Sequence, residues 1–558
     1  MPSRKKISFN TKYIFVSGGV ISGIGKGTTA ASIALLLKSA GYKVAPIKFE
    51  NYLNLDAGTI NPIEHGDPFL CEDGTEADMD IGTYEKFLDE NMGKDNFVTV
   101  GNIYQTVIDR ERRFEYNGED VEAIPNITDE IIHRIESLGR KTKADIVIIE
   151  LGGTAGEYQN IFYYEASRMM TLKKPQDIIH VHVSYVPTPG HLGEPKTKPT
   201  QLSVRTLNSM GIQPDFIITR GERYLDQRRK DRLALFCNMQ KEDVISSPDL
   251  HSVYEIPLVL SKQGLEKRIM KKLGLPVRKP NLKEWISFVE STKNVKNKIE
   301  IAIVGKYFGT GDYQLRDSYA ALFDAIDHAG WKLGVNVSTR WVDAEKIEKE
   351  GIEQVIGKPD GIIVPIGWGE RGAEGMISAA SYARINKIPY LGLCYGMQLA
   401  VIAFARDVLG FNDANTEENK TTKHPVIHFI PSQKEFLRKK AYGGTMRLGG
   451  WDAIIKKSTQ TYDMYKKYNG FKNFGKSLAS ERHRHRYEFN DDFTKDFESK
   501  GLIISARSVM ENLVEIVELP KTMHPFYLGT QGHPEYKSRP LSPHPIFLSF
   551  INSCFQKQ

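Results

Sequence analysis

The stretch Leu391-Gly-Leu-Cys-Tyr-Gly-Met-Gln398 decides how the second half of this chain folds. Apolar residues at 388–393 predict a short buried strand, and those from Met397 onward predict a helix. Cys394 lies between them in a Gly-x-Cys-x-Gly pattern, which suits a sharp turn that lifts the central side chain clear of a sheet. A helix N-terminus beneath the sulfur favours the nucleophilic thiolate. The alternative is a buried structural cysteine, the usual fate of a free cysteine.

Length and composition limit the remaining possibilities. At 558 residues, with 40% apolar and 26% charged residues, the chain reads as a soluble globular protein of two to four domains. The four cysteines (Cys71, Cys237, Cys394, Cys554) lie far apart, which argues against a disulfide framework or zinc site and predicts a reducing, cytoplasmic location. The basic N-terminus lacks the apolar core of a secretory signal, and no apolar run approaches the roughly 20 residues that span a bilayer. A net charge of +6 suits anionic small ligands and is too weak to indicate nucleic acid.

The order of apolar runs predicts the architecture. In the first half, runs at 13–16, 145–150, 178–183 and 216–219 predict buried strands that alternate with helices. Such alternation is typical of a parallel sheet with helices on both faces. A second series of the same kind opens at 299–304. We therefore expect two doubly wound, mostly parallel α/β domains at 1–274 and 299–558, joined by a Pro- and Lys-rich linker at 275–298.

A glycine-rich segment, 18–27, follows the first predicted strand and opens a helix, which is the context of a phosphate-binding loop. Its backbone N–H groups can approach phosphate oxygens, and Lys26 can reach a β- or γ-phosphate. The segment is not a strict P-loop, because Val20 stands where the first glycine belongs and Gly27 replaces the usual Ser or Thr. A simple turn is the alternative, but Gly-Lys-Gly at a helix start argues against it.

Acidic and basic groups elsewhere in the first half fit a phosphate site. Glu150 ends an apolar strand, a position from which a carboxylate can point at a phosphate-bound magnesium ion. The acidic cluster at 72–80 offers more candidates, although such a cluster is more often a solvated loop. Lys-Thr-Lys-Pro-Thr-Gln at 196–201 suits a triphosphate and a polar base, but alone it would be an ordinary exposed loop.

Cys394 needs a base and an oxyanion hole to act as a nucleophile. His533 and Glu535 are two residues apart, so in an extended chain both project to one face and the carboxylate can orient the imidazole. A lone histidine could equally be structural, but with Gly-x-Cys-x-Gly it predicts a triad. The segment 365–369 follows a predicted strand and is expected to supply an oxyanion-hole N–H.

Several motifs together resemble the CTP synthases, over nearly the whole chain. The most specific are Lys-Thr-Lys-Pro-Thr-Gln at 196–201 and Arg-His-Arg-His-Arg-Tyr at 482–487, and Gly-Gly-Thr-Met-Arg-Leu at 443–448 also matches. The resemblance implies an amidoligase domain of the dethiobiotin-synthetase type fused to a class I glutamine amidotransferase. ATP would phosphorylate O4 of UTP, and ammonia from glutamine would displace the phosphate to give CTP. It also implies Mg²⁺, GTP as activator, CTP as feedback inhibitor and a homotetramer, with no nucleic-acid or membrane partner, and leaves open whether the tetramers form filaments.

The resemblance assigns roles residue by residue. ATP binding is implied for Ser22, Gly23, Ile24, Gly25, Lys26, Gly27, Lys48, Asp80, Arg220 and Asp249. Metal binding is implied for Asp80 and Glu150. UTP and CTP binding is implied for Ser22, Glu157, Tyr158, Gln159, Lys196, Lys198, Gln201 and Arg232. Glutamine binding is implied for Gly367, Gln398, Glu418 and Arg484, around the triad of Cys394, His533 and Glu535.

The chain departs from the family pattern at several places. Glu157 and Gln159 stand where Asp and Glu are usual, Asn126 replaces a histidine, Arg232 replaces a lysine, and Gly532 replaces a phenylalanine. Ile366 occupies the position of the first glycine in the family's Pro-Gly-Gly-Phe-Gly motif. If the backbone at that position needs a positive φ, a β-branched residue resists this conformation. These departures predict altered feedback or glutaminase regulation.

Two other functions fit parts of the sequence. A glutamine-dependent amidoligase that acts on a carboxylate shares the two-domain plan, but the 196–201 loop argues against it. A non-catalytic filament subunit is disfavoured because Lys26, Asp80, Glu150, Cys394, His533 and Glu535 are all present.

Overall fold

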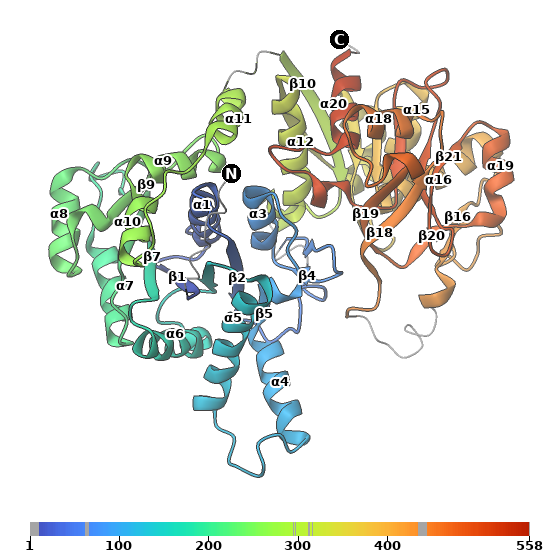
Figure 1. The fold of residues 1–558 in the computed structure, drawn as a ribbon. Helices are drawn as coiled ribbons and strands as arrows, with labels where there is room; N and C mark the ends of the chain where they lie inside the picture. The colour runs from blue at the N-terminus through green and yellow to red at the C-terminus, as the bar shows by residue number, and fades with distance from the viewer. Residues whose placement is uncertain are drawn as a thin grey trace, which may run out of the picture. The chain divides into compact units, whose positions relative to one another are not determined.

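The computed structural model describes residues 10–61, 66–293, 295, 297–310, 313–314, 316–433 and 443–556 (Figure 1). The chain forms two compact units. The first comprises Met1–Asp56 and Asp80–Val289, and the second comprises Ala57–Met79 and Glu290–Gln558. The described residues of the 57–79 segment thus belong to the second unit, although the segment is continuous in sequence with the first. None of the described helices is long and apolar enough to cross a membrane.

The first unit is built on a seven-stranded sheet in which every neighbouring pair of strands is parallel. In spatial order the strands are β5 (Phe97–Thr99), β2 (Val44–Glu50), β6 (Ile146–Leu151), β1 (Lys12–Gly19), β7 (Ile178–Tyr185), β8 (Phe216–Gly221) and β9 (Val244–Pro248). All of β6 is buried, as expected for a parallel strand covered on both faces. The predicted parallel sheet is confirmed.

Helices cover this sheet and place its functional segments. They are α1 (Lys26–Ser39), α3 (Met79–Leu88), α4 (Val100–Arg112), α5 (Thr128–Thr142), α6 (Ile161–Lys173), α7 (Lys198–Ser209), α8 (Gln227–Phe236), α9 (Ile256–Lys262), α10 (Leu265–Lys272) and α11 (Lys283–Lys293). In register, Lys48 on β2 lies opposite Glu150 on β6, which lies opposite Val16 on β1. The carboxyl ends of three adjacent strands therefore meet at one edge, where open α/β sheets bind ligands.

The second unit has a nine-stranded mixed sheet. Its parallel part contains β13 (Val335–Asp343), β10 (Asn297–Gly305), β14 (Gly361–Val364), β15 (Tyr390–Leu393) and β23 (Tyr527–Thr530). An antiparallel part follows, formed by β22 (Val514–Glu518), β21 (Ile503–Ser508), β18 (Arg447–Ile455) and β19 (Leu478–His485). The doubly wound plan is confirmed, and the antiparallel extension was not predicted.

Two apolar cores lie on opposite faces of this sheet. One core packs beneath α13 (Ala344–Glu350), α15 (Ala373–Ile385) and α16 (Tyr395–Phe404). The other packs beneath α12 (Ala320–Leu333), α18 (Gln460–Lys467) and α20 (Pro545–Gln556). Shorter elements are α14 (Ile352–Ile356), α19 (Thr494–Ser499), β3 (Phe69–Leu70), β4 (Glu76–Ala77), β11 (Gly309–Thr310), β12 (Tyr313–Gln314), β16 (Asn415–Thr416), β17 (Pro425–Phe429) and β20 (Tyr487–Phe489).

Two candidate active sites

Cys394 forms the turn between β15 and α16, as the sequence predicts. Its backbone has φ 51° and ψ −98°, outside the regions that most residues occupy, and its side chain is buried. A Cβ on Gly392 would lie 2.6 Å from the carbonyl carbon of Gly396, and a Cβ on Gly396 would lie 2.0 Å from the Val364 oxygen. Both flanking positions therefore require glycine, because larger residues would overlap the backbone around the nucleophile.

His533 and Glu535 form the expected buried pair. The Nδ1 atom of His533 lies 2.6 Å from Oε1 of Glu535. Burial lowers the pKa of His533, but the negative charges of Glu535 and Cys394 raise it by more, to about 10. Within the described part of the chain, Nε2 makes no conventional hydrogen bond, so this nitrogen is the one left to interact with the sulfur. At neutral pH the His533 imidazole therefore carries a proton on both nitrogens.

The loop after β14 lies against the nucleophile turn. A Cβ on Gly367 would lie 3.0 Å from both a ring carbon of Tyr395 and the Lys306 side chain. Lys306 donates from Nζ to the carbonyl oxygens of Gly369, at 2.8 Å, and Arg371, at 3.0 Å, which fixes the shape of this loop. Because the first N–H groups of a helix lack intrahelical partners, the Tyr395 amide is a second candidate oxyanion donor.

Ile366 does not adopt the positive φ that would strain a β-branched residue at this position. It is not among the described residues with positive φ, and its side chain is buried in the core that includes Leu391 and Leu393. A β-branched residue is therefore accommodated next to Gly367 in an ordinary backbone conformation.

The four expected glutamine-binding residues differ in their surroundings. Glu418 lines a cavity of about 240 Å³ together with Gly369 and Tyr395, a neighbour of the nucleophile, whereas Gly367, Gln398 and Arg484 are not part of its lining. Arg484 instead donates from Nε to Glu76 at 2.6 Å and from Nη2 to the Gly58 oxygen at 3.2 Å. Its guanidinium is already paired with a carboxylate of the 57–79 segment.

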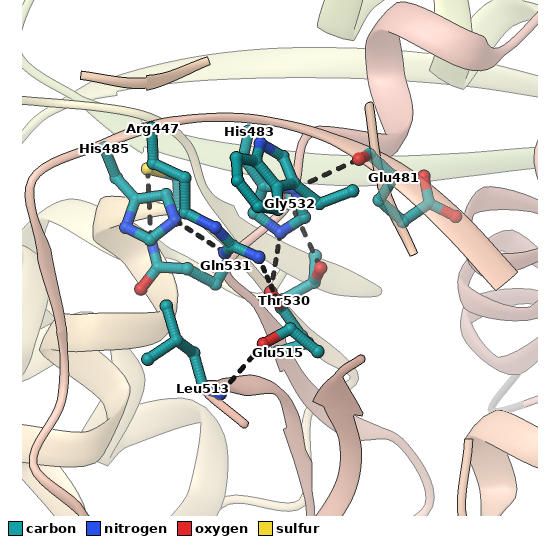
Figure 2. Close-up of polar contacts among 12 residues, drawn as sticks. Arg447, Glu481, His483, His485, Leu513, Glu515, Thr530, Gln531 and Gly532 are labelled. Carbon is teal, nitrogen blue, oxygen red and sulfur yellow. Dashed lines mark hydrogen bonds and ion pairs between the residues drawn. The ribbon is translucent and has the colours of Figure 1, made fainter. Parts of the chain in front are cut away.

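Sequence reasoning missed a buried polar network beside the triad (Figure 2). The Glu515 carboxylate accepts from Arg447 at 2.6 Å and contacts Nε2 of His483 at 2.6 Å. Burial alone would raise the pKa of Glu515, but His483 and Arg447 hold it well below its usual range. Burial also lowers the pKa of His483 and His485. The 482–487 motif was the available signal, but it did not show these partners.

Gly532 belongs to the same region and explains one departure from the family pattern. A Cβ at this position would lie 2.8 Å from the Glu481 Cβ and 3.3 Å from the His483 ring. The neighbouring side chains have taken the space that a larger residue would need.

In the first unit, the glycine loop connects β1 to α1 as predicted. Gly25, at φ 87°, caps the helix, and the Lys26 side chain crosses Gly18 so closely that a Cβ there would lie 2.6 Å from the lysine Cδ. A Cβ on Gly27 would lie 2.2 Å from an Asp80 carboxylate oxygen. Gly27 replaces the usual Ser or Thr because Asp80 occupies that space.

Lys48 gathers the carboxylates at this edge of the sheet. Its Nζ contacts Asp80 and lies 2.9 Å from Glu150 and 3.1 Å from Glu50. Burial raises the pKa of Glu150, and its second oxygen accepts from the Tyr84 hydroxyl at 2.7 Å. Burial would also raise the pKa of Asp80, but Lys48 lowers it overall. Asp80 and Glu150 offer the carboxylate oxygens that Mg²⁺ prefers.

Arg220 and Asp249 lie together next to the glycine loop. Arg220 donates to the Ser247 and Pro248 oxygens at 3.0 Å and contacts Asp249 at 3.3 Å. A Cβ on Gly25 would lie 3.6 Å from its Nε. Within the loop, Ser22 and Gly23 are exposed and Ile24 is buried. The structure therefore brings the expected ATP residues into one region.

Apart from Ser22 in the glycine loop, the expected UTP residues fall into two groups that no hydrogen bond or ion pair joins among the described residues. Glu157 accepts from the Thr154 amide at 2.8 Å, and the Tyr158 and Gln159 side chains after it are exposed. The other group lies on and around α7 and α8. It consists of Lys196, which pairs with Glu194; Lys198, whose ammonium lies 5.4 Å from the Phe236 ring centre; Gln201, which donates to Thr197; and exposed Arg232.

Comparisons with known proteins cover both units. Residues 12–275 match the family model "CTP synthase N-terminus", and residues 314–553 match "Glutamine amidotransferase class-I". The CTP synthase of Caldanaerobacter subterraneus subsp. tengcongensis is 47% identical over 544 residues, which cover 97% of this chain and 98% of that protein. The chain belongs to the CTP synthase family. The CTP synthase of Methanocaldococcus jannaschii is 46% identical over 552 residues, covering 97% and 98% of the two chains.

A solved structure is also similar to part of the chain. It is a Trypanosoma brucei CTP synthase glutaminase domain with bound acivicin, 36% identical, with a TM-score of 0.41; the match covers 47% of this chain and 95% of that one. The sequence relatives and family models confirm the resemblance to CTP synthases that the motifs indicate. The chain is therefore a ligase of pyrimidine nucleotide biosynthesis with a glutamine amidotransferase domain.

Proposed function

We propose that this CTP synthase releases ammonia from glutamine with Cys394, His533 and Glu535, and phosphorylates UTP at the Lys26 loop. The observation that carries the first assignment is the buried Cys394 on its constrained turn beside a histidine whose pKa is raised to about 10. The observation that carries the second is the meeting of Lys26, Lys48, Asp80 and Glu150 at the carboxyl ends of adjacent strands.

In the glutaminase, the Cys394 thiolate attacks the amide carbon of glutamine, and an S–C bond forms. The Gly367 and Tyr395 N–H groups stabilise the oxyanion that develops. When the C–N bond breaks, the Nε2 proton of His533 passes to the leaving nitrogen, which departs as ammonia. His533 then takes a proton from water as it hydrolyses the thioester. Glu535 keeps the imidazole oriented through Nδ1. Glu418, at its cavity, would pair with the substrate ammonium.

In the synthase, Lys26 and Lys48 balance negative charge on the transferring γ-phosphoryl group. Burial lowers the pKa of Lys26, and the Glu150 and Asp80 carboxylates oppose that effect. Asp80 and Glu150 would hold Mg²⁺, which when bound would neutralise phosphate charge. Arg220 and Asp249 would hold ATP. Ser22, the 157–159 turn, Lys196, Lys198, Gln201 and Arg232 would hold UTP.

We further propose a cytoplasmic homotetramer, activated by GTP and inhibited by CTP. The division of the expected UTP residues into two groups, with Tyr158, Gln159 and Arg232 exposed, supports a site completed by another subunit. The four cysteines are buried thiols and not disulfides, which suits a reducing compartment. We also propose that the synthase domain ends at 274 and the glutamine amidotransferase domain begins at 299.

The test follows CTP formation by its ultraviolet absorbance, with UTP, ATP and Mg²⁺ and either ammonia or glutamine with GTP. Cys394→Ala should abolish glutamine-dependent synthesis and leave ammonia-dependent synthesis intact, because the two sites lie in different units. Loss of both activities in a folded variant would contradict the two-site assignment, and no product from either nitrogen source would refute the synthase site.

A further inference from the structure

A buried amide that the triad does not include contacts the nucleophile. Gln531 follows β23, two residues before His533, and its side chain has no exposed surface. Its Nε2 donates to the Cys394 sulfur at 3.4 Å. None of the roles expected from the sequence involves this residue.

The direction of this hydrogen bond is fixed by its neighbours. Gln398 donates from Nε2 to the Tyr487 carbonyl oxygen at 2.9 Å, and a carbonyl can only accept. The same Gln398 nitrogen donates to Oε1 of Gln531 at 3.2 Å. The Gln531 oxygen therefore faces Gln398, so its NH₂ group is the end that faces the sulfur. A flipped Gln531 amide would set two NH₂ groups against each other.

Gln531 is also held from its backbone side. Its N–H donates to the Glu515 carbonyl oxygen at 2.8 Å, and the Thr530 carbonyl before it accepts from the Cys394 N–H at 2.7 Å. The Glu515 side chain is in turn fixed by Arg447 and His483, which point toward it (Figure 2). The amide donor thus sits on a rigid, fully buried strand end, so it has no room to leave the sulfur.

We propose that Gln531 is a further catalytic residue of the glutaminase, which stabilises the Cys394 thiolate by donating an amide hydrogen bond to it. The inference rests on the proposed role of Cys394. Loss of a hydrogen-bond donor destabilises a buried anion considerably more than it destabilises a buried neutral group. The hydrogen bond from Gln531 therefore favours the thiolate over the thiol. When the thioester forms, the sulfur loses its charge and the bond weakens; hydrolysis restores both.

The test compares three variants of the full-length protein. Gln531→Met removes the donor and keeps the length of the side chain, and Gln531→Glu keeps the shape and adds a negative charge. Gln354→Met, at an exposed position of the same unit, is the matched control. The measurement is the pH dependence of iodoacetamide alkylation at Cys394, with Cys394→Ala as the blank for the other three cysteines, which are buried.

We expect the alkylation midpoint to rise by about 1 to 2 pH units in Gln531→Met, the equivalent of one lost hydrogen bond to a charged group. It should rise further in Gln531→Glu and stay unchanged in Gln354→Met. Glutamine-dependent kcat/KM should fall most at low pH, where the variant sulfur is protonated. Ammonia-dependent CTP formation, which uses the other unit, shows whether the variants are folded.

Alkylation midpoints within about 0.3 pH units of wild type in both folded Gln531 variants would overturn the inference. One pH unit corresponds to about 1.4 kcal/mol, so such a shift is too small for a lost hydrogen bond to a charged group. Failure of the proposed function gives a different result. In that case wild-type Cys394 would alkylate normally and the Gln531 variants would still shift its midpoint, but no glutamine would be hydrolysed.

Discussion

Replacing Gly27 with serine, the residue type that phosphate-binding loops usually carry at this position, should inactivate the synthase rather than improve it. The new Cβ would lie 2.2 Å from one Asp80 carboxylate oxygen and 2.6 Å from its carboxyl carbon. Ordinary contacts of this kind begin at about 3.4 Å, so the carboxylate must retreat by about 1 Å. Asp80 would then leave both its contact with Lys48 and its place beside the phosphate loop.

A displacement of about 1 Å at a reacting centre costs on the order of 100-fold in rate, or about 2.7 kcal/mol in activation free energy. The assay is ammonia-dependent CTP formation over a range of Mg²⁺ concentrations. We expect a roughly 100-fold loss of kcat and a higher Mg²⁺ requirement in both Gly27→Ser and Gly27→Ala. The alanine variant has the same Cβ without a hydroxyl, so it separates the steric effect from any new metal ligand.

Two controls make the result interpretable. Gly475→Ala places a Cβ 3.6 Å from the side-chain oxygen of Asn473, an ordinary contact in the other unit, and should leave synthesis unchanged. Glutamine hydrolysis by the Gly27 variants should persist if they fold. If Gly27→Ser formed CTP at a rate within threefold of wild type, the prediction would be wrong, because the Asp80 carboxylate could then move without loss of activity.

Two further predictions concern the glutaminase. Because the folded-state pKa of His533, about 10, lies above its ordinary value of 6.5, its stabilising contribution is complete below about pH 6.5 and is lost as pH rises through about 10. Urea unfolding between pH 6 and 10 should show this decline in the free energy of unfolding of the wild type. Glu535→Gln should make the free energy of unfolding less dependent on pH and lower glutamine-dependent kcat by about 10⁴-fold. An unchanged pH dependence in this variant would contradict the His533–Glu535 pairing. Gly396→Ala should destabilise the protein by about 1 to 3 kcal/mol, because its Cβ would lie 2.0 Å from the Val364 oxygen. An unchanged denaturation midpoint would show that the turn can widen.

Much of the architecture could be read from local pattern. Buried parallel strands such as β6 consist of continuous apolar residues, and a glycine loop between a strand and a helix is a local feature of the chain. The same holds for the Cys394 turn, since Gly392 and Gly396 are required by contacts within a few residues and with the neighbouring strand. The His533–Glu535 pair was also predictable, but the extended chain expected for it is wrong, because Glu535 lies in a short 3-10 helix that His533 caps.

Local sequence was enough to predict the two α/β halves, the turn at Cys394, the His533–Glu535 pair and the glycine loop, because each depends on residues close together in the chain. Which distant side chains lie next to one another depends on the tertiary structure. Asp80 fills the position beside Gly27, Glu76 pairs with Arg484 more than 400 residues away, and Gln531 donates to Cys394 across a strand. Such contacts depend on sheet order and register, which bring particular side chains within a few ångströms and are not encoded in any short segment.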